Sequence, residues 1–77
     1  MEEFISYLVK NMVDEPERVE VHSLTGEHET LIKIRVAPDD VGKVVGRKGM
    51  SIKSLRTLAT NIGARLGQRV HLEVTQP

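Results

Sequence analysis

The chain has no cysteine and no tryptophan, and its aromatic side chains are limited to Phe4 and Tyr7. Without cysteine there is neither a disulfide framework nor a thiolate metal site. No apolar run approaches the roughly 20 residues that a membrane-spanning helix needs. The start of the chain, residues 1–10, is acidic and amphipathic and so differs from a signal peptide. These features predict a cytoplasmic protein without membrane contact.

The formal net charge is zero, because 11 basic residues balance 11 acidic ones. The balance hides an asymmetry along the chain. Residues 1–40 contain ten acidic and four basic side chains, whereas residues 41–77 contain seven basic and one acidic. The two halves therefore carry about −6 and +6. Because polyanion binding depends on the local field, the second half is the candidate binding region.

The spacing of apolar residues predicts helices over residues 3–12, 41–45 and 51–66, and strands over 18–25, 29–37 and 69–75. Thr25 to His28 supply a hairpin turn, and the helical crossover before the last strand favours a parallel pair. The sequence therefore predicts an α+β fold of order α-β-β-α-α-β, with three helices on one face of a three-stranded mixed sheet. Its length, 77 residues, predicts a single domain, with residues 29–77 as the β-α-α-β core and residues 1–28 preceding it.

Finer details of the helices follow from single residues. Asp39 or Asp40 is expected to cap the helix over residues 41–45. Gly63 lies inside the longest helix, where it indicates either close packing or fraying, and Gly67 is expected to end that helix. The outer face of the sheet is expected to expose its charged and histidine side chains: Glu20, His22, Lys33, Arg35, His71 and Glu73.

The turn Gly46-Arg47-Lys48-Gly49 joins the two central helices. Glycine tolerates positive φ and has no Cβ, so backbone amides can approach a ligand closely. Two cations between the glycines, followed by a helix, favour a phosphate at this point. The alternative is that the glycines only permit a tight turn between helices.

Residues 45–52, VGRKGMSI, resemble the K-homology (KH) signature: an apolar residue, Gly-x-x-Gly, two spacers and isoleucine. The preceding VGKVVG, residues 41–46, resembles the longer form of that signature. A helix and strand leading into a β-α-α-β core are similar to the type II, bacterial arrangement. The whole chain resembles small bacterial single-KH RNA-binding proteins of the KhpA kind.

The resemblance implies that residues 46–49 clamp the sugar-phosphate backbone of single-stranded RNA, as KH loops hold about four nucleotides. Bases would lie on an apolar floor for which Val44, Val45 and Ile52 are candidates, and Gly42 would allow close approach. The implied RNA-binding residues are Gly42, Lys43, Val45, Gly46, Arg47, Lys48, Gly49, Ser51, Ile52, Lys53 and Arg56. Lys43, Lys53 and Arg56 would contact phosphates. No cofactor, metal or small-molecule substrate is expected, and the role implied is that of a post-transcriptional regulator or RNA chaperone.

Two departures from the KH pattern predict weak and sequence-tolerant binding. Only Gly67-Gln68 separates the last helix from the last strand, and no aromatic side chain falls near the loop to stack on bases. Dimerisation or a partner would then raise avidity. Similar small KH proteins are associated with homodimers and with a second KH-containing protein.

Two other classes of function stay open. One is a protein-interaction adaptor, a dimerising KH scaffold with little RNA affinity of its own. The other is a nucleotide-binding enzyme, although no acidic residue lies between Val41 and Leu72 to hold magnesium. A Walker-type loop starting at Gly42 would also need glycine where Arg47 stands and serine or threonine where Gly49 stands. The sequence therefore predicts a binding protein and not an enzyme.

Overall fold

The computed structural model describes residues 2–45 and 52–75. Its elements are α1 (Glu2–Lys10), the 3-10 turn η1 (Pro16–Arg18), β1 (Glu20–Thr25), β2 (Glu29–Arg35), the 3-10 turn η2 (Pro38–Asp40), α2 (Val41–Val45), α3 (Ile52–Arg65) and β3 (Arg69–Thr75). The predicted order α-β-β-α-α-β is confirmed.

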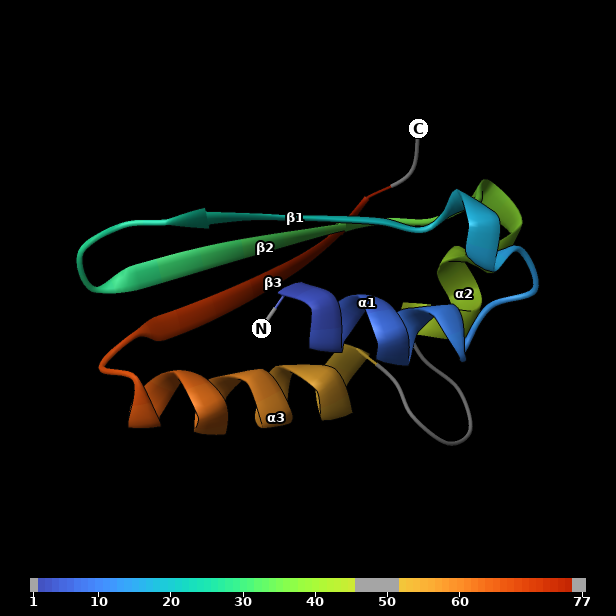
Figure 1. Cartoon of the computed structure of the whole chain (residues 1–77). Helices are drawn as coiled ribbons and strands as arrows, with labels where there is room; N and C mark the ends of the chain where they lie inside the picture. Colours follow the sequence, from blue (N-terminus) through green and yellow to red (C-terminus); the bar gives the residue numbers. More distant parts are fainter. Residues whose placement is uncertain (1, 46–51, 76–77) are drawn as a thin grey trace.

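The three strands form one mixed sheet in the order β1-β2-β3. β1 pairs antiparallel with β2, with Val21 opposite Ile34, and β2 pairs parallel with β3, with Ile32 opposite Leu72. The parallel pair follows from the helical crossover through α2 and α3. All three helices lie on the same side of the sheet, with α1 and α3 beneath the strands and α2 next to η2 and β3 (Figure 1). The predicted α+β architecture is confirmed.

The core fills the space between the sheet and the helices. Ile5 of α1, Ile32 and Ile34 of β2, and Leu55 and Ala59 of α3 are fully buried. Along β2 and most of β3 buried and exposed side chains alternate, as a half-buried strand requires. The predicted outer-face residues are all exposed.

The first helix is shorter than predicted, and a 3-10 turn occupies part of the segment between it and the first strand. α1 ends at Lys10, and the amides of Asn11 and Met12 bond three residues back to Leu8 and Val9, which tightens the last turn. Pro16 starts η1, where its fixed φ and missing N–H are tolerated. The predicted first strand consequently starts at Glu20.

The end of α3 explains both glycines of that region. Gly67 has a φ of 74°, the amide of Gln68 donates to the Gly63 carbonyl at 2.8 Å, and the Gly67 amide donates to Ala64 at 3.2 Å. This pair of bonds is a Schellman ending, so Gly67 stops the helix as predicted. A Cβ on Gly63 would collide with Val70 Cγ2 and lie 2.9 Å from the Gln68 carbonyl oxygen. Of the two interpretations of Gly63, close packing and fraying, close packing is therefore confirmed.

The predicted capping of the helix over residues 41–45 is wrong. The turn η2 runs directly into α2, and within the described residues neither Asp39 nor Asp40 accepts a hydrogen bond from an amide of α2. Asp40 is buried, and its carboxylate accepts hydrogen bonds from the amides of Asp14 and Glu15 instead. A carboxylate so placed links two segments that are distant in the sequence.

Candidate nucleic-acid interface

The predicted RNA-binding residues that the structure describes lie on α2 and α3. Gly42, Lys43 and Val45 belong to α2, and Ile52, Lys53 and Arg56 belong to α3. The predictions for Gly46, Arg47, Lys48, Gly49 and Ser51 fall outside the described residues. Their part in the site stays a prediction.

α2, α3 and β3 are neighbours in space. α2 contacts both α3 and β3, and α3 packs along β3, which is an edge strand of the sheet. The KH resemblance further implies an RNA groove between the two central helices and the last strand, and these are the same three elements. The fold thus brings the described parts of the predicted site together.

The three candidates for an apolar floor have different environments. Val44 is completely buried in the core, so a base could contact it only if α2 moved. Val45 is 52% exposed and Ile52 is 9% exposed. The role predicted for Val44 is therefore wrong, Ile52 is almost completely covered, and Val45 is accessible to a ligand.

The cations of α3 are exposed to solvent. Lys53, Arg56 and Arg65 all lie on the solvent side of a helix that contains no acidic residue. None of the ion pairs found in residues 2–45 and 52–75 involves α3. A cation in the first turn opposes the helix dipole, typically by about 0.3–1 kcal/mol, so Lys53 does not favour helix formation. This placement suits the binding of an external anion.

Lys43 differs from Lys53 and Arg56 because two carboxylates already surround its ammonium group. Its Nζ lies 2.9 Å from Asp14 Oδ2 and 3.5 Å from Asp40 Oδ1. The hydrogen bond and charge of Asp14, supplemented by Asp40, raise the pKa of Lys43 above its ordinary value. In this arrangement Lys43 is engaged within the protein, which weakens its predicted role as a phosphate contact.

Asp40 is the residue of this region that sequence reasoning missed. Burial opposes ionisation of its carboxyl group, but the amides of Asp14 and Glu15 and the charge of Lys43 outweigh burial and lower its pKa. The three-residue spacing between Asp40 and Lys43 is a detectable signal for an ion pair. Nothing in the sequence points to Asp14 or Glu15 as its other partners.

Two shallow cavities lie away from these residues. One lies at the hairpin end and is lined partly by His28, Glu29 and Arg69, and the other lies between α1 and β1, near Tyr7 and Val21. Neither contains a predicted RNA-binding residue. Within the described ranges, no group of three or more histidine and acidic side chains is placed to hold a metal ion. No described helix combines the length and apolar character needed to cross a bilayer.

Comparison with known proteins gives matches along nearly the whole chain. The family profile described as "KhpA/KhpB, KH domain" matches residues 2–74. Among similar proteins, the RNA-binding protein KhpA of Chlamydia pneumoniae is 40% identical over 76 residues, which cover 99% of this chain and 97% of that protein. The proteins of the same name from Aquifex aeolicus and Streptomyces coelicolor are 36% identical over 76 residues and 44% identical over 72 residues. These alignments cover 99% and 94% of this chain, and 96% and 90% of the relatives.

No solved structure matches the chain. The profile nevertheless covers every helix and strand described above except the last residue of β3. The element order, the mixed sheet and the KH signature agree with that match. The chain belongs to the KhpA/KhpB family of KH-domain proteins.

Proposed function

We propose that this protein binds single-stranded RNA and acts as a post-transcriptional regulator or RNA chaperone, with residues 1–77 working as one KH module. The observation that carries the proposal is the exposed cationic side of α3, next to α2 and β3 and without counter-charges in the described structure. The relatives named above support it, since each is called an RNA-binding protein.

In the proposed complex, Gly46 to Gly49 hold the sugar-phosphate backbone, and Lys53 and Arg56 contact further phosphates along α3. Such contacts fix the position of the strand but carry no sequence information. Bases would turn toward Val45, which is half exposed. The two aromatic side chains, Phe4 and Tyr7, lie on α1 and not on α2, α3 or β3. The proposal is therefore one of weak binding with broad sequence tolerance.

Weak binding by one copy favours a role in which several modules act together. A homodimer, or a pair with a second KH-containing protein, would raise avidity without any new RNA contact. We place this activity in the cytoplasm and propose a binding role, with no catalytic step. Exposed apolar side chains on α1, Phe4 at 43% and Tyr7 at 67%, favour the alternative of a dimerising adaptor.

The test reverses the two charges of the loop. Arg47→Glu with Lys48→Glu is expected to lower affinity for a fluorescently labelled oligouridine about 100-fold, because two charge-assisted contacts of about 1.5 kcal/mol each are lost. Fluorescence anisotropy measures the affinity, and circular dichroism confirms folding. The matched control is Lys10→Glu with Lys33→Glu, an equal charge change at two exposed residues of the N-terminal half that belong to none of the ion pairs found in the described structure.

An equal loss of affinity in the control pair would show that only net charge matters. An unchanged affinity in the loop variant would defeat the proposed clamp. Partner binding that ignores both salt and the loop charges would support the adaptor.

A further inference from the structure

α2 is described over Val41–Val45, and Gly46 follows it in the sequence. An isolated helical segment shorter than about 12 residues does not hold its conformation in water, because nucleation costs more than the few hydrogen bonds return. Its orientation must therefore come from tertiary contacts. These contacts include the buried side chain of Val44, the partly buried side chain of Val41 and a polar network at the first turn.

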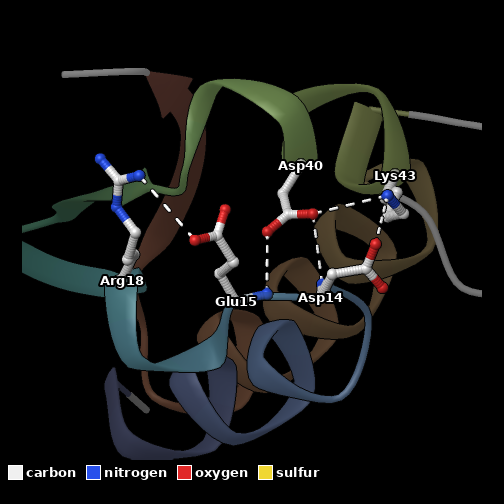
Figure 2. A network of polar contacts seen from close by, with 5 residues as sticks. All are labelled: Asp14, Glu15, Arg18, Asp40 and Lys43. Atoms are coloured by element: carbon white, nitrogen blue, oxygen red, sulfur yellow. Dashed lines mark hydrogen bonds and ion pairs between the residues drawn. The ribbon is translucent and has the colours of Figure 1, made fainter.

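The network centres on the carboxylate of Asp40, whose side chain is 1% exposed. Oδ1 accepts a hydrogen bond from the amide of Asp14 at 3.2 Å, and Oδ2 accepts one from the amide of Glu15 at 3.1 Å. Figure 2 shows the carboxylate reaching from the turn before α2 to the connector between α1 and η1. These bonds join residues that are 26 and 25 positions apart in the chain.

Lys43 closes the network from the side of α2. Its ammonium group lies between Asp14 and Asp40, 2.9 Å and 3.5 Å from their oxygens (Figure 2). A buried carboxylate needs paired charge and hydrogen bonds, and removing one partner leaves the other uncompensated. Lys43 therefore has a role within the fold that Lys53, on α3, does not share. Movement of Lys43 to a phosphate would leave Asp40 with less compensation.

We propose that Asp40, Lys43 and Asp14 form a positioning group for RNA binding. The group locks α2 to the connector between α1 and η1, and so fixes the position of Val45, the last described residue before Gly46. Lys43 acts through this lock and makes no phosphate contact. This inference deepens the proposed function and rests on it.

The salt dependence of RNA affinity separates positioning from direct contact. Each phosphate contact on a single strand contributes about −0.7 to the slope of log K against log salt. Lys53→Met, the matched control with an exposed cation, is expected to make the slope less steep by about 0.7. Lys43→Met is expected to lower affinity about tenfold with an unchanged slope. Lys43→Arg, which can keep both ion pairs, is expected to restore most of the affinity.

Asp40→Asn tests the same group through the carboxylate. One of the two oxygens becomes an amide nitrogen, which cannot accept the hydrogen bond that a backbone amide now donates to it. This variant is also expected to lose about tenfold in affinity without a change of slope. All titrations are made at a temperature where circular dichroism shows every variant fully folded. A slope change in Lys43→Met equal to that in Lys53→Met would overturn the positioning role. Native RNA affinity in both Lys43→Met and Asp40→Asn would also overturn the positioning role, because these residues would then affect only the stability of the fold.

A measurement without RNA keeps this inference separate from the proposed function. In ¹⁵N–¹H spectra, Asp40→Asn is expected to shift the amide signals of Asp14, Glu15 and residues 41–45 while leaving the β2–β3 pair nearly unchanged. Unshifted α2 signals would refute the lock even if RNA binding were normal. If the loop variant Arg47→Glu with Lys48→Glu bound RNA like the native chain, the proposed function would fail, and the α2 signals would still decide whether the lock exists.

Discussion

Replacing Gly63 by alanine is expected to destabilise the protein, although alanine is the better helix former. In a helix interior this exchange alone would gain about 1 kcal/mol. At Gly63, however, the new Cβ would collide with Val70 Cγ2 and lie 2.9 Å from the Gln68 carbonyl oxygen. Val70 is β-branched and buried, and Gln68 belongs to the hydrogen-bonded turn that ends α3, so neither neighbour moves freely.

The magnitude follows from these opposing effects. Overpacking a well-packed site typically costs about 1–3 kcal/mol, and a backbone neighbour places this site toward the upper end. After subtraction of the helix-propensity gain, Gly63→Ala is expected to lower the free energy of unfolding by about 1–2 kcal/mol. For a domain of this size the melting temperature would fall by roughly 5–15 °C.

Urea unfolding followed by circular dichroism measures the free energy, and a thermal scan gives the melting temperature. The double variant Gly63→Ala with Val70→Ala should lose less unfolding free energy than the sum of the losses in the two single variants, because removing Val70 Cγ2 relieves the collision. Equal or higher stability of Gly63→Ala alone would refute the packing argument. Strict additivity in the double variant would also contradict it.

Two further predictions concern α2 and its network. Gly42→Ala is expected to raise the free energy of unfolding by up to about 1 kcal/mol, because a Cβ at this position meets nothing within 4 Å. The same variant is expected to weaken RNA binding in anisotropy titrations, because the added methyl group would stand where the RNA strand approaches α2. Unchanged affinity would remove Gly42 from the site. Asp40, with its lowered pKa, is expected to contribute stability above about pH 4 that is lost as pH falls through its folded-state pKa. The free energy of unfolding, measured in urea at a series of decreasing pH values, should therefore fall more steeply for the native chain than for Asp40→Asn. An equal fall with pH in the two proteins would contradict this.

The sequence was sufficient to predict the element order and the sheet because those features depend on local patterns. Alternation in residues 29–37 and 69–75 identified two strands, and the helical crossover between them favoured a parallel pair, which the structure confirms. Gly67 was identifiable as a helix stop because few other residues adopt positive φ.

Other features depend on contacts that a local pattern does not contain. Val44 and Val45 are adjacent and chemically identical, and the apolar spacing within Val41–Val45 does not define which one faces the core. Asp40 was assigned to its own helix because its partners, Asp14 and Glu15, are far away in the chain. The same contacts engage Lys43, which the sequence alone presented as one more free cation. The predictions for residues 46–49 and Ser51 remain predictions.

We propose that single-stranded RNA binds along α2, residues 46–51 and α3. A titration of ¹⁵N-labelled protein with unlabelled oligouridine, followed by ¹⁵N–¹H spectra, tests this placement. We expect the largest shifts on residues 42–56 and on β3, with little change at the β1–β2 hairpin, residues 25–29. Shifts concentrated on the outer face of the sheet, or no shifts at all, would contradict it.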